Sequence, residues 1–439
     1  MNKERKSWLL NQTLTAMIFF VLFIYAIFTT IPWASKPRPN VPIVSSSNPN
    51  HSGVKVYLYD LPSKFNYGVV KHFWITLGFA DVVTLKYPSH QHSLEWHLFK
   101  ELARPEMERF GSPIIRVSNP NEADLFYIPF FSSLSWVVSK AHIPEGSGRV
   151  KTYSDSETQE ELLTWLKGQE YWRRSKGRDH VLMCQNPNAL NRVMDRVKNI
   201  VLLVSDFGRI RPDQSSLVKD VVVPCSHRIS AYNGDIGVEN RKTLLFFMGN
   251  PFRKGGGKVR DFLFQVLENE EDVIMKHGPP SETNQRLASQ GMHSSKFCLD
   301  PAGTMPASCR LFDAILSMCV PVIISDRIEL PFEDVIDYRK IAIFVDSTSA
   351  VKQGFLVAML RNVTTERILE YQRELKLVKR YFDYKDPNGT LNEVWRQVSQ
   401  KLPLIKLMIK QDRRLAMMHV TEPNCSCLCL NQSSIATTL

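Results

Sequence analysis

Two series of short, almost wholly apolar runs, separated by helical stretches, restrict the fold of this chain more than any other feature. The runs occur at 55–59, 125–129, 180–183, 200–204 and 221–223, and again at 244–248, 273–276, 296–299, 321–325 and 341–345. Strands that are apolar on both faces, with helices between them, are typical of parallel sheets covered on both sides. The sequence therefore predicts an α/β fold with two Rossmann-like domains facing a cleft.

The first 53 residues have a different composition from the rest of the chain. Residues 14–31 form an 18-residue stretch without a charge, and Lys3, Arg5 and Lys6 precede it. This pattern predicts a cytosolic tail at 1–13 and a transmembrane signal anchor at 14–32, with the remainder in the lumen. The alternative, a cleaved signal peptide, usually has a shorter apolar run. Residues 33–53 are rich in Pro, Ser and Asn, which predicts an extended stem.

The remaining chain divides into three predicted parts. An N-terminal domain is expected at 54–235, a C-terminal domain at 236–402, and a tail containing cysteines at 403–439. Acceptor sequons for N-glycosylation support a lumenal location and occur at Asn50, Asn362, Asn388, Asn424 and Asn431. Eight cysteines are present, and in an oxidising lumen some of them should pair, although the sequence does not give the connectivity. A metal clip in the tail is the alternative, but no nearby histidine completes a zinc set.

Residues 294–338 contain the segment that most directly indicates a ligand. A strand and a Gly/Pro turn precede a helix expected to start near Ser308, with Arg310 in its first turn. A helix N-terminus and a guanidinium group both suit phosphate oxygens. Glu329 and Glu333 follow the next strand, where a carboxylate could bind sugar or ribose hydroxyls; capping of a short helix is the alternative. Together these residues predict a pocket for a sugar nucleotide.

A second cationic segment spans residues 246–261, a strand followed by a glycine-rich turn and a helix. Arg253 and Lys258 are expected to contact the donor phosphates, the alternative being a solvated basic loop. The segment is not a P-loop, because Val259 stands where that motif has a hydroxyl residue. The chain contains no Asp-x-Asp triplet. We therefore expect a site that uses cationic side chains and no metal ion.

The catalytic base is expected in the first domain. Asp206 follows a buried strand, the usual place for a functional group in this architecture, and Glu95 is the second candidate, with a structural role as its alternative. His90 and His92 are further candidates. Exposed aromatic residues could stack on acceptor sugars, although such residues more often pack in a core: Trp136, Trp165, Tyr171 and Trp172.

Five segments of the chain resemble the exostosin-like glycosyltransferase family: 55–68, 119–133, 177–182, 201–209 and 294–338. The ending TEPNCSCLCLNQS at 421–433 is similar to the plant branch that resembles arabinan arabinosyltransferases. The resemblance implies a GT-B arrangement and a single-pass type II protein of the Golgi membrane. It also implies inverting transfer of a pentose, such as arabinose, from a UDP-linked donor to pectic arabinan of the cell wall, without a cofactor.

Several alternatives stay open at this point. Transfer of galactose, xylose or glucuronic acid fits the same family, and a non-catalytic Golgi partner subunit or a lumenal carbohydrate-binding module fits the same location. Homo- or hetero-oligomers with other transferases are compatible with every one of these interpretations. The net charge is +11, but lysine and arginine are scattered and no nucleic-acid motif is present. The sequence therefore argues against a nucleic-acid partner.

Overall fold

The computed structural model describes residues 53–79, 86–109, 111–141, 153–250, 258–278, 281–303 and 305–421. The predicted cytosolic tail, membrane anchor and nearly all of the stem lie outside these ranges, as do residues 422–439 of the predicted tail. Among the helices that the structure describes, none is long and apolar enough to cross a membrane.

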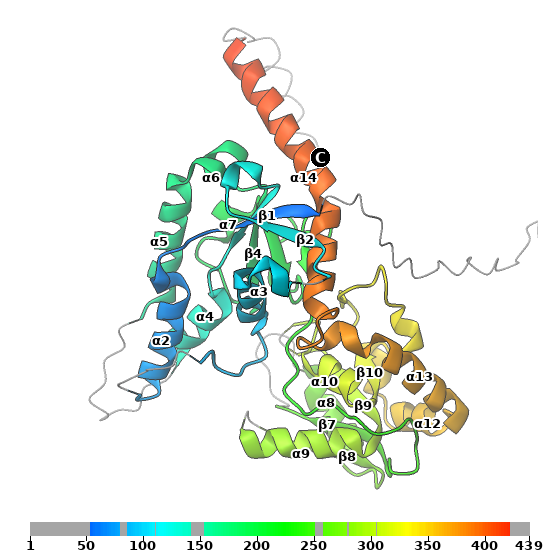
Figure 1. The fold of residues 1–439 in the computed structure, drawn as a ribbon. Helices are drawn as coiled ribbons and strands as arrows, with labels where there is room; N and C mark the ends of the chain where they lie inside the picture. Colours follow the sequence, from blue (N-terminus) through cyan, green and yellow to red (C-terminus); the bar gives the residue numbers. More distant parts are fainter. Residues whose placement is uncertain are drawn as a thin grey trace, which may run out of the picture. The chain divides into compact units, whose positions relative to one another are not determined.

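The first sheet has six parallel strands in the order β2-β1-β3-β4-β5-β6 (Figure 1). The strands are β1 Val54–Leu58, β2 Ile114–Val117, β3 Leu125–Ile128, β4 His180–Cys184, β5 Val201–Val204 and β6 Val221–Val222. Every residue of β3, β4 and β5 is buried, as expected for central parallel strands covered on both faces. The chain moves outward from β1 to β2 and then continues on the other side with β3, so the topological switch point lies between β1 and β3.

The second sheet has five parallel strands in the order β11-β10-β9-β7-β8. They are β7 Thr243–Met248, β8 Val273–Lys276, β9 Ser295–Pro301, β10 Val320–Ile324 and β11 Ile343–Phe344. The chain moves outward from β7 to β8 and continues on the other side with β9, which places the switch point between β7 and β9. In open parallel sheets of this kind, ligands bind at the carboxyl ends of the strands beside the switch point.

Helices follow most of the strands, and they cover the faces of both sheets (Figure 1). Around the first sheet these are α2 Tyr67–Thr76, α3 Leu94–Ala103, α4 Ser132–Lys140, α5 Asp155–Gly168, α6 Glu170–Ser175 and α7 Met194–Val197. Around the second they are α8 Lys258–Leu267, α9 Glu282–His293, α10 Arg310–Leu316, α11 Ser347–Ala350, α12 Phe355–Arg361 and α13 Thr365–Val378. The Ser154, Ser281 and Thr364 side chains cap α5, α9 and α13, each accepting a hydrogen bond from a backbone N–H of the first turn.

The last helix, α14 (Thr390–Thr421), returns to the first sheet after the chain has completed the second. It contacts α3, β2 and β6, and its fully buried Trp395 packs edge-to-face against Tyr127 of β3. Further along, the Arg178 guanidinium donates to both carboxylate oxygens of Asp412, at 2.6 and 3.2 Å. The first part of α14 therefore braces the first sheet, although it follows the second sheet in the chain. One continuous apolar core includes residues of both sheets and of this helix.

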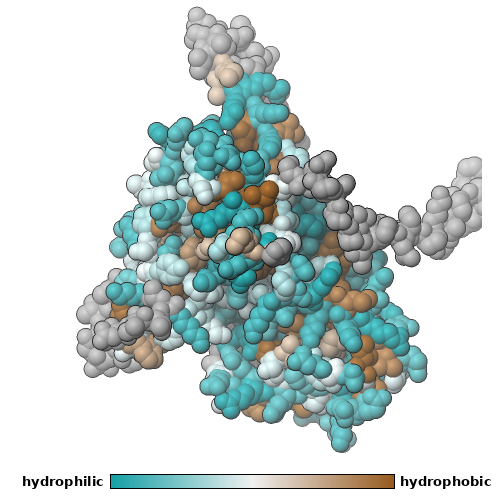
Figure 2. Space-filling view, viewed as in Figure 1, coloured by the Kyte–Doolittle hydropathy of each residue, from teal (hydrophilic) through white to brown (hydrophobic). Residues whose placement is uncertain are grey.

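All ten predicted strands are present, and the predicted α/β class with two parallel sheets is confirmed. The boundary predicted at 235/236 falls in the segment between β6 and β7. One strand was not predicted. β2 has exposed residues at Ile115 and Arg116, so it lacks the continuous apolar run by which the other strands were recognised. The face of the molecule seen in Figure 2 is mainly hydrophilic, with hydrophobic residues in several small patches.

Candidate active site

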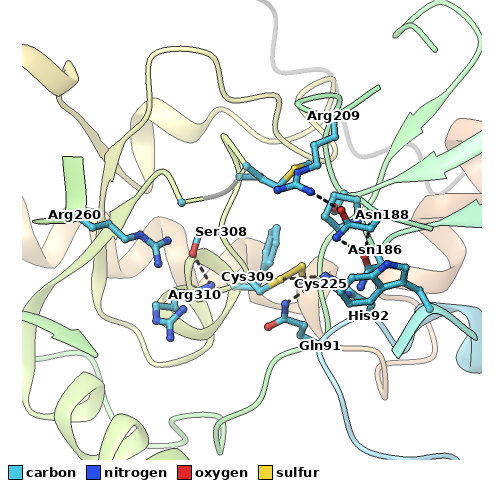
Figure 3. Close-up of a pocket in the computed structure, with 17 residues that line it drawn as sticks. Gln91, His92, Asn186, Asn188, Arg209, Cys225, Arg260, Ser308, Cys309 and Arg310 are labelled. Carbon is cyan, nitrogen blue, oxygen red and sulfur yellow. Dashed lines mark hydrogen bonds between the residues drawn. A yellow bond between two sulfur atoms is a disulfide. The ribbon is translucent and has the colours of Figure 1, made fainter. Parts of the chain in front are cut away.

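A cavity of about 510 Å³ lies at the carboxyl ends of strands from both sheets. Residues after β4 and β5, together with His92 and Trp136, line one side of it. Residues of α8, of the turn after β9 and of α10 line the other side. Figure 3 shows Arg260, Ser308 and Arg310 on one side and Gln91, His92, Asn186 and Asn188 opposite them. The position agrees with the switch point of the second sheet, where a ligand is expected.

Three arginines line this cavity, Arg209, Arg260 and Arg310, and the last two are held at the ends of β7 and β9. The Arg310 Nε atom donates to the carbonyl oxygen of Met248, the last residue of β7. Arg260 Nε and Nη2 donate to the carbonyl oxygens of Ala302 and Pro301, at 3.1 and 2.8 Å. Both guanidinium carbons lie 5.6 Å from the centre of the Phe247 ring, a distance typical of cation–π contacts. The two cations are therefore held in fixed positions at the ends of β7 and β9, where an anionic group would be bound.

Two glycines allow the arginines to lie this close to the backbone. A Cβ atom at Gly249 would come within 3.0 Å of Arg310 Nη2, and a Cβ atom at Gly303 within 2.8 Å of Arg260 Nη2. A larger residue at Gly303 would displace the Arg260 guanidinium group, and one at Gly249 would crowd both the Phe247 ring and the Arg310 guanidinium group. These two glycines follow β7 and β9 and complete the cationic side of the cavity.

The predicted donor residues Ser308 and Arg310 are both in this cavity. Helix α10 begins at Arg310, slightly later than expected, and the Ser308 hydroxyl accepts a hydrogen bond from the Arg310 backbone N–H at 3.4 Å. Arg310 therefore occupies the first turn, as predicted. Arg260 belongs to the cationic segment at 246–261, and its position beside Arg310 follows from the fold and not from local sequence.

Of the other predicted donor residues, those within the described ranges do not line this cavity. Lys258 is exposed at the start of α8, and Arg253 lies outside the described residues. Glu329 is only partly buried in the loop after β10. The Glu333 carboxylate accepts a hydrogen bond from the Leu330 backbone N–H at 3.4 Å, which agrees with the capping alternative. The prediction that Glu329 or Glu333 binds a sugar hydroxyl is not supported by these positions.

Asp206 connects the two halves of the structure. Its Oδ1 atom accepts a hydrogen bond from the Gly208 N–H at 2.9 Å, and Oδ2 accepts one from the Ala307 N–H at 3.0 Å. Burial raises the pKa of this carboxyl group. Its neighbours Ser205 and Arg209 line the cavity, but Asp206 does not. Because both oxygens are occupied by backbone donors, the structure gives Asp206 a structural position and not the position predicted for a catalytic base.

Glu95 is also fixed within the protein. Its side chain is completely buried and accepts hydrogen bonds from the Tyr87 hydroxyl and from the backbone N–H groups of Ser133 and Leu134. Burial raises its pKa to about 7, although these hydrogen bonds act in the opposite direction. Glu95 thus joins α3 to the start of α4 and does not reach the cavity. The structural alternative is the one that its position supports.

His92 is the residue of general-base type that the structure brings to this cavity. It lies just before α3, and its Nε2 atom is 3.4 Å from Gln91 Nε2 and 3.9 Å from Cys309 Sγ. Burial lowers its pKa to about 3, with smaller contributions from His90 and Arg228. The imidazole is therefore neutral at ordinary pH. Among the described residues that line the cavity there is no carboxylate.

Two disulfides are present among the described residues. Cys225, after β6, pairs with Cys309, which precedes α10, and this bond lies in the cavity beside His92 (Figure 3). Cys298 of β9 pairs with Cys319 just before β10, and Cys184 is a buried free thiol. The expectation that some cysteines pair is confirmed, whereas Cys425, Cys427 and Cys429 lie outside the described ranges. His92, Cys225 and Cys309 have the spacing of a metal site, but both sulfurs are used by the disulfide.

The predicted glycosylation sites fall into two groups. Asn362 and Asn388 are exposed, and the Asn362 sequon ends with Thr364, the capping residue of α13. Asn50, Asn424 and Asn431 lie outside the described residues. Of the aromatic candidates, Trp136 lines the cavity, Trp172 is buried, and Tyr171 stacks on Phe126 with ring centres 5.0 Å apart. Trp165 of α5 packs edge-to-face against Tyr59, with ring centres 5.4 Å apart.

Comparison with known proteins now identifies the family. Residues 50–360 match the model of the exostosin GT47 domain. The chain belongs to the exostosin GT47 family. It is 56% identical to the probable arabinosyltransferase ARAD1 of Arabidopsis thaliana, over 99% of this chain and 100% of that protein. This GT47 protein is accordingly a glycosyltransferase.

More distant relatives carry other names. The GT47 chain is 28% identical to the probable glucuronosyltransferase GUT1 of Oryza sativa subsp. japonica, over 80% of this chain and 82% of that protein. It is 27% identical to the probable beta-1,4-xylosyltransferase IRX10L of Arabidopsis thaliana, with the same coverage. Among solved structures, Anabaena Alr3699/HepE in complex with UDP and glucose aligns with 80% of this chain and 99% of its own, at 10% identity and a TM-score of 0.34.

The GT47 site also contains a buried carboxyl group without a hydrogen-bond partner. Asp300, near the end of β9, is 2% exposed, and neither of its oxygens has a partner within the described part of the chain. Burial raises its pKa to about 7. The nearby Ser308 hydroxyl and the positive charges of Arg260 and Arg310 act to lower this pKa. The Asp313 carboxyl group acts to raise it. Asp300 is thus a buried acidic group near two arginine charges, without a hydrogen-bond partner among the described residues.

We expect Asp300 to make the stability of the folded protein depend on pH. Its folded pKa is about 7 and its ordinary value is 3.8, so between these values the folded state binds more protons than the unfolded state. The free energy of unfolding should therefore fall as pH rises through this range, by on the order of 1 kcal/mol per pH unit from this group. Asp300→Asn should remove that contribution, which chemical denaturation at several pH values would measure. Exposed Asp235→Asn is the control, and equal slopes in wild type and Asp300→Asn would contradict the prediction.

Proposed function

We propose that this glycosyltransferase transfers arabinose from a UDP-linked donor to an arabinan side chain of pectin, in the Golgi lumen, by inverting displacement. The observation that carries the proposal is the composition of the cavity. Two fixed arginines lie at the switch point of the second sheet, and a neutral histidine lies on the opposite side. A nucleotide-sugar reaction needs these two functions, charge stabilisation for the diphosphate and a base for the acceptor.

In the proposed reaction the donor diphosphate lies beside Arg260 and Arg310. The bond between the anomeric carbon and the diphosphate oxygen breaks, and its electron pair leaves with UDP. The acceptor hydroxyl oxygen forms the new bond from the opposite face, and its proton moves to His92. The guanidinium groups stabilise the negative charge that develops on the diphosphate, and their fixed positions avoid a reorganisation cost. A metal ion has no assigned role in this proposal.

The sugar and the acceptor are proposed from the relative that is named an arabinosyltransferase and matches this chain over its full length. Transfer of xylose or glucuronic acid is the alternative favoured by the relatives with those names, and transfer of galactose stays open. The Golgi membrane location and type II topology rest on the apolar stretch at 14–31 and the charges before it. Oligomers with other transferases fit this location as well.

The proposal can be tested with the full chain, produced in a eukaryotic host and purified in detergent. Thermal unfolding would be followed with UDP and with a panel of UDP-sugars, with and without a chelator. A ligand that binds only the folded state raises the melting temperature. UDP should do so in the presence of chelator, and transfer to soluble arabinan should occur with UDP-arabinose and not with the other sugars.

The possible results separate the alternatives. Transfer from a different UDP-sugar would replace arabinose as the donor and retain the site. Stabilisation by UDP only without chelator would overturn the metal-independent site. A complete absence of nucleotide stabilisation would support a non-catalytic partner subunit, and stabilisation by free oligosaccharides alone would support a carbohydrate-binding module.

A further inference from the structure

A separate groove of about 780 Å³ lies at the carboxyl ends of β1 and β2. Tyr57 and the residues after it line the groove from β1, and Arg116 and Ser118 line it from β2 and the turn that follows. Tyr67 at the start of α2 and Trp165 of α5 are also on its walls. None of its lining residues belongs to the cavity that holds Arg310 and His92.

Three aromatic side chains that line this groove are partly or fully exposed: Tyr57, Tyr67 and Trp165. Their ring contacts are all edge-to-face. Tyr57 contacts Tyr59 and Phe126, Tyr67 contacts Trp96 and Phe99, and Trp165 contacts Tyr59. Within the described ranges none of the three has a stacked ring partner. An unstacked aromatic face offers a flat, electron-rich surface to the C–H groups of a ligand.

Polar groups stand between and around these rings. Asp60, Ser63 and Ser118 are exposed in the groove. The exposed Arg116 is oriented by a hydrogen bond from its Nη1 atom to the Leu102 carbonyl oxygen at 3.0 Å. Asn66 is only 4% exposed, yet it lines the groove. Its Oδ1 atom accepts a hydrogen bond from the Tyr67 N–H, whereas its amide nitrogen has no partner among the described residues.

This combination limits the kind of ligand that the groove can bind. The charges of Asp60 and Arg116, the acidic and the basic side chain of the groove, cancel each other. The groove therefore lacks the positive charge needed for a polyanion such as nucleic acid. A lipid surface is also a poor ligand, because it would bury the hydroxyl, amide and carboxylate groups of the groove without giving them hydrogen-bond partners. A neutral carbohydrate has apolar C–H faces and hydroxyl edges, and it therefore matches both kinds of surface.

The groove lies on the same edge of the first sheet as the cavity. The cavity contains residues that follow β4 and β5, and the groove contains residues that end β1 and β2. In the order β2-β1-β3-β4-β5-β6 only β3 separates β1 from β4. With about 4.8 Å between neighbouring strands, β1 lies roughly 10 Å from β4 along this edge. A few linked sugar residues cover such a distance.

We propose that the groove binds sugar units of the acceptor polysaccharide that are several residues away from the unit receiving the new sugar. This inference rests on the proposed function, because it takes the acceptor to be a neutral chain such as arabinan. Tyr67 and Trp165 provide stacking faces, and Asn66 and Asp60 hydrogen-bond sugar hydroxyls. The groove thereby favours long acceptors over short ones.

Binding to the groove can be measured without turnover. In affinity electrophoresis of the full chain, soluble linear arabinan in the gel should slow the migration of the wild-type protein. Tyr67→Ala or Trp165→Leu should reduce the apparent affinity for arabinan about tenfold. Trp165→Phe retains a ring face and should recover most of the binding, which a loss of packing volume alone would not explain. Phe355→Ala removes an exposed aromatic side chain of α12 far from the groove in sequence and serves as the control.

A second measurement uses linear arabinan oligosaccharides of increasing length as acceptors. The acceptor KM of the wild type should fall with length, and the loss in the Tyr67→Ala and Trp165→Leu variants should grow with length. Equal arabinan affinity in wild type and both groove variants would overturn the inference even if transfer occurs. If arabinan slows the migration of the protein but no UDP-sugar supports transfer, the proposed function is contradicted. The groove would then still be a carbohydrate-binding site.

Discussion

Replacing Arg310 with alanine should lower kcat/KM for sugar transfer by about 10²- to 10³-fold, the usual effect of removing one preorganised group that stabilises developing charge. Arg310 is the first residue of α10, lines the cavity, and is fixed by its hydrogen bond to the Met248 carbonyl oxygen and by the Phe247 ring. Its planar guanidinium can meet two phosphate oxygens at once. Initial-rate kinetics with the UDP-sugar donor would measure the loss.

Two further variants show whether the effect belongs to the site. Arg310→Lys keeps the charge but not the planar fork, so transfer should recover only in part. Arg339→Ala removes an arginine whose side chain is 83% exposed and paired with Asp337, and it should behave as wild type. UDP should stabilise Arg310→Ala less than wild type. Undiminished transfer by a folded Arg310→Ala protein would exclude Arg310 from the donor site.

The sequence was sufficient for the layout of the fold because its central strands are continuous apolar runs. β4, for example, is buried along its whole length, and so is β10. The edge strand β2 escaped recognition because exposed Ile115 and Arg116 interrupt its apolar character. Predictions from periodicity are therefore strongest where a strand is covered on both faces.

The sequence predicted the residues on the cationic side of the cavity better than it predicted the catalytic base. Arg310 and Ser308 belong to one short segment, so local pattern was enough to place them together. The environments of the carboxylates depend on residues far away in sequence: Asp206 is bound by the Ala307 N–H, 101 residues away, and Glu95 by the Ser133 N–H, 38 residues away. Such contacts leave no local pattern. The position of Asp206 at the end of a strand indicated a functional residue. It could not show that the carboxylate oxygens accept hydrogen bonds from the backbone of the folded chain.

His92 was recognised in the sequence as a candidate base but was ranked below both carboxylates. Its position in the cavity depends on contacts with distant residues. The Gln91 carbonyl oxygen accepts a hydrogen bond from the Ser226 N–H at 2.9 Å, and Cys309 lies beside the His92 ring. The disulfide between Cys225 and Cys309 joins two segments that are 84 residues apart. Only the assembled fold therefore shows that a neutral imidazole faces the arginines.

Replacing His92 with alanine should reduce kcat by about 10²- to 10⁴-fold, the range for loss of a general base, while UDP still stabilises the folded protein. Because burial lowers the pKa of His92 to about 3, protonation of this group should not reduce kcat/KM between about pH 8 and pH 5. An acid limb with a midpoint near 6.5, the ordinary histidine value, that disappears in His92→Ala would contradict the lowered pKa but retain His92 as the base. Steady-state kinetics across this pH range would measure both effects.

Three matched variants separate the base from residues that support the fold. His97→Ala removes a half-buried histidine, whose pKa burial lowers to about 4 and which does not line the cavity, so kcat should be retained. Asp206→Asn and Glu95→Gln should lower the melting temperature more than they lower kcat, since each carboxylate is occupied by backbone donors. A loss of kcat in Asp206→Asn as large as that in His92→Ala, at unchanged melting temperature, would return the catalytic role to Asp206.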